Sequence, residues 1–219
     1  MFNMSAKLLA SVCALAAFTS VSHASTIKYD IPNNLARNVV QNNSAVLFAE
    51  QSGVSVGDGQ VTVDYLASNL TFGTANRGVN TFTSGFDLGA GTYDSFLIHF
   101  DPAIRSGSAR TFDTFSFEDD IIAVILSNSG PGGASRLLND SDDVFGAPNT
   151  DYENNNARRA ERNDTFTLID PITISVNLSA NDKHIDNIRV ITAPAVVPVP
   201  AAGLLLLTAL GGFAIFRRR

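Results

Sequence analysis

The chain contains no tryptophan, and its single cysteine, Cys13, lies near the N-terminus. Cys13 falls in a segment that we expect to be removed on export. The mature protein is therefore predicted to have no disulfide, no thiol nucleophile and no cysteine-based metal site. Sugar sites usually stack a sugar ring on tryptophan or tyrosine. The chain offers only four tyrosines for this role, and only Tyr152 falls in a long predicted loop.

Basic residues are also scarce in the central part of the chain. Residues 25–195 hold 21 acidic and 11 basic residues, a net charge of −10, and only two of the bases are lysines. Proteins that bind nucleic acids need a basic face for the phosphates, so this balance argues against that function. An acidic surface favours solubility and is compatible with divalent cations.

The first 24 residues have the pattern of a secretory signal peptide. Lys7 supplies the positive charge, Leu8–Phe18 is the apolar stretch, and Ser22-His23-Ala24 is a small-x-small cleavage site before Ser25. We expect cleavage between Ala24 and Ser25, and export by the secretion machinery of a domain spanning 25–195.

A second apolar segment lies at the other end of the chain. Residues 201–216 carry no charge, and Val196–Phe216 is 21 residues long. A membrane-spanning helix needs about 17–25 residues. Pro198 and Pro200 suit a first helical turn, and Arg217–Arg219 close the segment, so the C-terminus is expected on the cytoplasmic side. The segment predicts one transmembrane helix; an ordinary single-pass anchor and a buried core helix are the alternatives.

The order of features in residues 196–219 is more specific than hydrophobicity alone. The pentapeptide Val197-Pro198-Val199-Pro200-Ala201 precedes the apolar segment, and Arg217, Arg218 and Arg219 follow it. This layout resembles the exosortase sorting signals of the PEP-CTERM group, in the VPLPA variant, with Val199 in place of leucine. The resemblance implies that a membrane-embedded exosortase recognises the motif, cuts near it, and releases or re-attaches the protein outside. It covers only the tail and assigns nothing to the domain before it.

The central domain has β periodicity. Short β-branched and phenylalanine-rich runs alternate with clusters of Gly, Asn, Asp and Ser, which is typical of strands and turns. The predicted strands are 45–50, 60–65, 79–83, 93–100, 111–117, 121–126, 165–169, 172–178 and 184–192. No window between the two terminal segments has a helical period, and 157–162 is the best candidate for an isolated helical turn. We therefore predict an all-β, antiparallel, jelly-roll-like β-sandwich.

Two connections in this predicted domain differ in length. Glu118-Asp119-Asp120 is expected to be a tight turn that joins the strands 111–117 and 121–126 in a hairpin. Residues 128–156 have little strand pattern and are expected to form one long loop rich in Asp and Asn. Such loops are often functional or mobile.

The long loop holds the candidate metal ligands. Asp140, Asp142 and Asp143, with Asn139, place several hard oxygen ligands within a few residues, as Ca²⁺ prefers. The spacing does not match an EF-hand. A solvated loop with Asx turns explains the same residues, so calcium stays one of two interpretations.

Catalytic candidates are few. Glu118, Asp119 and Asp120 could serve as glycosidase carboxylates, but three adjacent acids in a turn are also explained by solvation. His99 and His184 have no neighbouring nucleophile in a recognisable sharp turn such as Gly-x-Ser-x-Gly.

Together these features predict a non-enzymatic protein of the cell surface or extracellular matrix. It would begin as a membrane-anchored precursor, and its partners would be the secretion machinery, an exosortase and extracellular polysaccharide. The alternatives are a carbohydrate-binding (lectin-like) module, with or without Ca²⁺, and a secreted hydrolase.

Overall fold

The computed structural model describes residues 28–36, 39–77, 85–103, 108–126, 137–152, 158, 160, 163–181 and 185–193. The signal peptide with its Ala24–Ser25 bond, the predicted strand 79–83, His184 and the sorting signal 196–219 lie outside these residues. Within the described part, no helix has the length and apolarity needed to cross a membrane.

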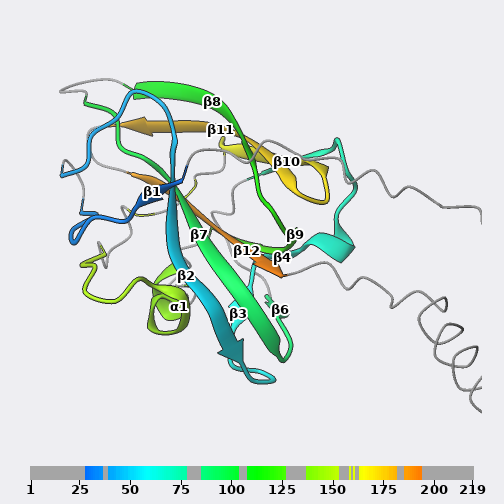
Figure 1. Ribbon diagram of the computed structural model, residues 1–219. Coiled ribbons are helices and arrows are strands. Elements are labelled where there is room, and N and C mark those ends of the chain that lie inside the picture. The colour runs from blue at the N-terminus through cyan, green and yellow to red at the C-terminus, as the bar shows by residue number, and fades with distance from the viewer. Residues whose placement is uncertain are drawn as a thin grey trace, which may run out of the picture.

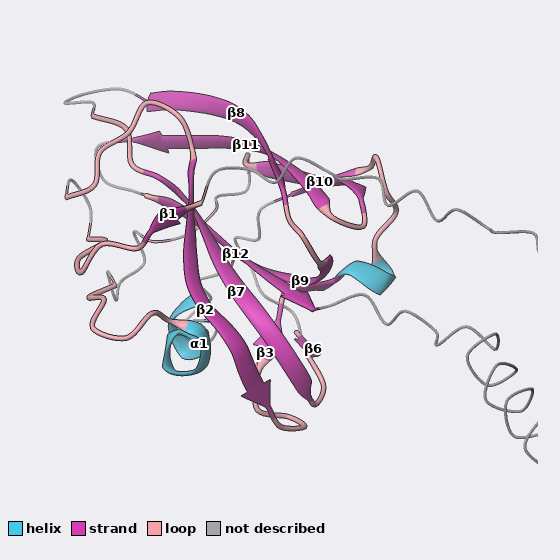
Figure 2. Ribbon diagram, in the orientation of Figure 1, coloured by secondary structure: helices cyan, strands magenta, loops and turns pink. Residues whose placement is uncertain are grey.

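The described part is mostly β-structure with one short α-helix and one 3₁₀ turn, Ala67–Asn69 (Figures 1 and 2). Its elements are β1 (Tyr29–Asp30), β2 (Val46–Val56), β3 (Thr62–Val63), β4 (Tyr65–Leu66), β5 (Ala75–Arg77), β6 (Phe86–Asp87), β7 (Gly91–Phe100), β8 (Ser108–Ser116), β9 (Asp120–Ile125), α1 (Leu137–Phe145), β10 (Thr165–Asp170), β11 (Thr173–Asn181) and β12 (Asp186–Ala193).

The largest sheet has the strand order β1-β2-β7-β12-β9-β4. Its strands pair antiparallel except for β1, which runs parallel to β2. The last described strand, β12, lies between β7 and β9 in the middle of the sheet, and almost all of its residues are buried. A strand in that position is covered on both faces, so its polar residues Asp186, Asn187 and Arg189 are buried as completely as its apolar ones.

A second sheet has the order β5-β10-β11-β8, and β3 pairs with β6 in a small third sheet. The hairpin predicted for 111–117 and 121–126 is wrong, because β8 pairs with β11 whereas β9 pairs with β12. The backbone N–H of Phe117 donates to Ile172 O and that of Ile121 donates to Pro171 O. Residues 118–119 therefore carry the chain from one sheet to the other instead of turning back in the same sheet.

The main core lies between the two larger sheets and is rich in phenylalanine. Alternate residues of each strand point into it, as the period-two patterns require. Phe96, Ile98 and Phe100 of β7 lie on this side, and Leu97 and His99 lie on the other. The other large contributors are Leu47, Phe115, Phe117, Val124, Leu126, Phe166, Leu168, Ile174, Val176, Leu178, Ile188 and Val190.

The opposite face of the six-stranded sheet is covered by α1 and by β3 and β6 (Figure 1). The prediction of one unbroken loop over 128–156 is wrong here, because residues 137–145 are helical. Leu137, Ser141 and Phe145 recur every four residues and are buried, as on the inner side of an amphipathic helix. Three aspartates and an asparagine hide this apolar stripe in the sequence, because these residues usually mark turns.

Candidate functional site

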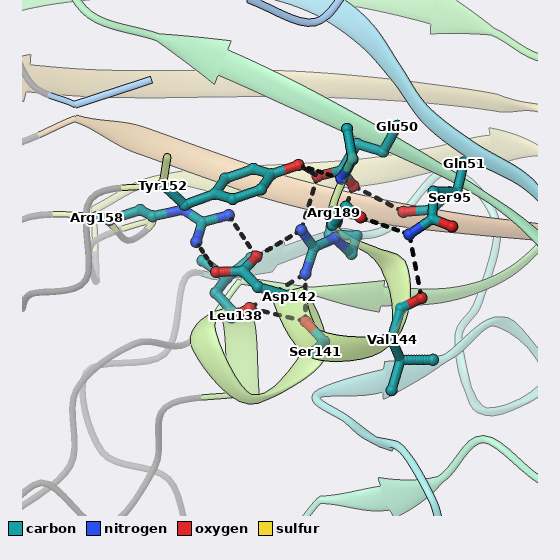
Figure 3. A network of polar contacts seen from close by, with 12 residues as sticks. Glu50, Gln51, Ser95, Leu138, Ser141, Asp142, Val144, Tyr152, Arg158 and Arg189 are labelled. Atoms are coloured by element: carbon teal, nitrogen blue, oxygen red, sulfur yellow. Dashed lines mark hydrogen bonds and ion pairs between the residues drawn. The ribbon is translucent and has the colours of Figure 1, made fainter. Parts of the chain in front are cut away.

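Polar side chains concentrate on the helix-covered face of the six-stranded sheet. Glu50 of β2, Ser95 of β7 and Arg189 of β12 come from three neighbouring strands, and all are buried. Figure 3 shows them meeting α1 and the segment that follows it. We call the set Glu50, Ser95, Ser141, Asp142, Tyr152, Arg158 and Arg189 the charge network.

The centre of the network is a fully buried ion pair. Arg189 donates from Nε to Glu50 Oε2 and from Nη2 to Oε1, both at 2.7 Å. Ser95 Oγ donates to Oε2, and Tyr152 OH donates to Oε1, again at 2.7 Å. Each carboxylate oxygen thus accepts two hydrogen bonds, as a buried charge requires to offset its desolvation.

A second acid connects this pair to a second arginine. Asp142 Oδ1 accepts from Arg189 Nη2 at 2.7 Å, and Oδ2 accepts from Arg158 Nη1 at 2.5 Å. Arg158 Nη2 also donates to Oδ1 at 3.1 Å, which makes that pair bidentate. Two carboxylates and two guanidinium groups therefore form a quartet with no net charge, in which all members are buried except Asp142, whose side chain is 18% exposed.

The arginines also hold the helix and an aromatic ring. Arg189 Nη1 donates to Leu138 O at 3.1 Å and to Ser141 Oγ, which ties β12 to the first turn and a half of α1. The Arg158 guanidinium lies 4.5 Å from the centroid of the Tyr152 ring, and that of Arg189 lies 5.8 Å away. Such cation–π contacts are favourable and stronger when desolvated.

The network continues through an amide to a histidine. The side chain of Asn187 is best oriented with its oxygen accepting from Arg158 Nε and its nitrogen donating to His99 Nδ1, both at 2.8 Å. His99 Nε2 then donates to Val40 O at 3.3 Å. The side chain of His99 is fully buried, so both ring nitrogens are engaged within the protein.

The protonation states follow from burial and partners. Burial raises the pKa of Glu50, but the charge and hydrogen bonds of Arg189 outweigh it and hold that pKa below its usual value. Burial lowers the pKa of His99, and the charge of Arg158 lowers it further, against the hydrogen bond that the ring donates to Val40 O. Burial and the neighbouring Glu50 raise the pKa of Tyr152. At neutral pH Glu50 is ionised, while His99 and Tyr152 are neutral.

The predicted calcium ligands do not converge. Asp142 is bound to two arginines, whereas Asp140 and Asp143 are exposed on α1. Within the described ranges, no three His, Cys, Asp or Glu side chains gather closely enough to hold a metal ion. The arrangement gives Asp142 a structural role in place of the ligand role considered for it.

The acids weighed as catalytic lie where the chain passes between the sheets. The Glu118 side chain is 74% exposed, and its Oε1 lies 3.8 Å from Lys28 Nζ. Burial, then the charges of Asp94 and Glu118, raise the pKa of Asp119. Asp120 is the first residue of β9 and belongs to the lining of an apolar groove with a volume of about 540 Å³. Leu66, Leu70 and Phe72 line the same groove.

Of the residues singled out from the sequence, Asp142, Tyr152 and His99 belong to or adjoin the network. Glu50, Arg158 and Arg189 were missed. A usable signal existed for two of them, because Glu50 directly follows an apolar run and Arg189 lies between Ile188 and Val190. Without knowledge of strand order, nothing in the sequence shows that β2 and β12 lie on either side of β7.

A scan against protein-family models and searches of curated proteins and of solved structures found no match to this chain. The fold and the network are therefore interpreted from their own geometry. The network is sealed by α1 and Tyr152 and balanced in charge, and these properties suit a structural clamp.

Proposed function

We propose that this chain is an exported, non-enzymatic protein of the cell surface or extracellular matrix, delivered as a membrane-anchored precursor and processed by an exosortase. The observation that carries the proposal is the order of Val197–Ala201, the apolar segment and Arg217–Arg219. In this proposal the tail is a substrate for another enzyme, and 25–195 is the cargo, a jelly-roll-like β-sandwich.

The described domain supports a role as stable cargo. Its buried charges neutralise one another, and its buried histidine has both nitrogens engaged. A catalytic acid or base must reach its substrate, and these side chains are enclosed by the protein. A clamp that fastens α1 to the sheet without a disulfide suits a protein that works outside the cell and has no cysteine beyond Cys13.

The test is the C-terminus of the protein isolated from the cells that make it. Intact mass is expected to show loss of Arg217–Arg219 together with the apolar segment. The variant Pro200→Ala is expected to accumulate in the membrane with its arginines retained, because it alters the motif. Pro194→Ala is the matched control, since it changes a proline outside the motif and should be processed normally. Wild-type protein that retains Arg217–Arg219 would refute the proposal and leave a permanent anchor.

A further inference from the structure

The four-stranded sheet has an outer face that carries hydroxyl and amide groups. Phe166 and Leu168 of β10 and Ile174 and Val176 of β11 point into the core, so the residues between them face away from it. We call the outward residues of the three longer strands the hydroxyl face. They are Arg110, Phe112, Thr114 and Ser116 of β8, Thr173, Ser175, Asn177 and Ser179 of β11, and Thr165, Thr167 and Ile169 of β10. Thr173 and Ser175, in the middle strand, are buried by their neighbours at 9% and 6% exposure.

The register aligns these side chains in rows across the strands. Phe112 lies opposite Asn177, which lies opposite Thr165. The next row toward the start of β8 pairs Arg110 with Ser179. In the other direction Thr114 Oγ1 donates to Ser175 Oγ at 3.3 Å. Polar groups thus surround the phenylalanine on the same surface.

Phe112 is the most exposed large hydrophobic side chain of the described residues, at 74%. A phenylalanine in a strand usually fills the core, but the side chain of Phe112 faces solvent. Neither Phe112 nor Ile169 belongs to a core cluster. A single exposed aromatic ring is ordinary on a protein surface. The ring of Phe112, however, is surrounded by side chains that can form hydrogen bonds, and Arg110 lies two residues away on the same strand.

The face carries few charged side chains. On the outward positions of β8, β10 and β11 the charged residues are Arg110 and, at the β10–β11 turn, Asp170. The Asp170 carboxylate accepts a hydrogen bond from Ile172 N at 2.9 Å. The domain has a net charge of −10, but on this face one positive and one negative side chain leave little net charge.

We propose that the hydroxyl face binds a neutral extracellular polysaccharide, with one sugar ring stacked on Phe112. A sugar ring has an apolar C–H face that packs on an aromatic face, and a rim of hydroxyls that the accessible side chains of Asn177, Arg110 and Thr114 can bond. The face is about 20 Å along β11 and about 10 Å across three strands, an elongated shape that suits a polymer.

The charge argument selects a neutral polymer over an acidic one. Arg110 is the one cation of the described face, whereas the whole domain has ten more acidic than basic residues. The net field at long range is therefore negative. A polyuronate would be repelled at long range. The inference rests on the proposed function only in placing the protein outside the cell, where such polymers occur.

The experiment is affinity electrophoresis of the full-length protein in a non-ionic detergent, through gels containing laminarin, hydroxyethyl cellulose or galactomannan, with a gel containing the acidic polymer alginate for comparison. Retention by at least one neutral polymer is expected. Phe112→Ala should weaken it about tenfold, the loss of one stacked ring, and Phe112→Tyr should retain it. Phe72→Ala is the matched control, because Phe72 is also exposed, at 49%, but lies in the apolar groove.

The proposal is overturned if none of the neutral polymers retards the protein, if Phe112→Ala and wild type are retarded equally, or if alginate retards it more strongly than they do. Self-association that Phe112→Ala abolishes, without retardation by a polymer, would also overturn it and assign the face to contacts between copies. The C-terminal mass reports the processing separately. If no neutral polymer retards the protein but its tail is trimmed, only the proposed polysaccharide-binding face is rejected. If a neutral polymer retards the protein but its tail is intact, only the proposed processing is rejected.

Discussion

Replacing Glu50 by glutamine tests whether the charge network holds α1 to the sheet. Both oxygens of Glu50 accept two hydrogen bonds, two of the four from Arg189. Glutamine has nearly the same shape, but one of its two positions becomes an NH₂ donor that faces donors. The substitution also leaves the quartet with a net positive charge. The perturbation is therefore electrostatic and hardly changes the packing.

The expected cost is large. Breaking a buried ion pair by removing one partner destabilises a protein by about 3–5 kcal/mol. For a domain of 150–250 residues, 1 kcal/mol shifts Tm by about 2–4 °C, so Glu50→Gln should lower Tm by roughly 10 °C. Thermal and urea unfolding of the full-length protein in non-ionic detergent, followed by circular dichroism, would measure both quantities.

The chain offers a matched control for the same chemical change. Glu118 pairs with Lys28 at 3.8 Å on the surface, and exposed pairs contribute about 0–1 kcal/mol, so Glu118→Gln should have little effect. Glu50→Met combined with Arg189→Met removes both members of the buried pair, and it should cost less than the sum of the two single changes. A loss below about 1 kcal/mol for Glu50→Gln, or strict additivity in the double variant, would refute the clamp.

Two further predictions concern pH and calcium. The pKa of His99 is lowered in the folded state, so the unfolded chain binds its proton first as the pH falls. Stability should therefore decrease below the unfolded pKa of about 6.5, with a slope of up to about 1.4 kcal/mol per pH unit. His99→Gln should remove this slope, and an unchanged pH profile would contradict the buried neutral ring. Because Asp142 is held by two arginines, neither Ca²⁺ nor EDTA should change Tm; a Ca²⁺-dependent rise in Tm that Asp140→Asn abolishes would restore the calcium interpretation.

The strands are the part of the fold that the sequence predicts well. Period-two patterns and apolar runs place β7, β9, β10, β11 and β12 within a few residues of their observed bounds. This works because the alternation of side chains along a strand is a local property of the backbone. The antiparallel, mostly β character of the described domain follows from it.

Strand partners were beyond the sequence, and the wrong hairpin at Glu118–Asp120 shows why. A short acidic connection serves equally well as a turn within one sheet and as a crossing between two. The outcome depends on which side Phe115, Phe117 and Ile121 present to the shared core. That choice is made by packing among residues far apart in the chain.

The buried charges likewise separate what the sequence predicts from what depends on tertiary structure. By itself the sequence determined the excess of acids, the single cysteine, the strand periodicity and the tail whose motif resembles a sorting signal. Only the tertiary structure brought Glu50 to Arg189, 139 residues away, and turned Asp142 from a candidate ligand into their partner. It also put Phe112 outside the core. Composition and hydrophobic periodicity are local properties that can be read from the sequence. A buried charge pair or an exposed face of a sheet depends on which strands pair, and strand pairing is decided by contacts between residues far apart in the chain.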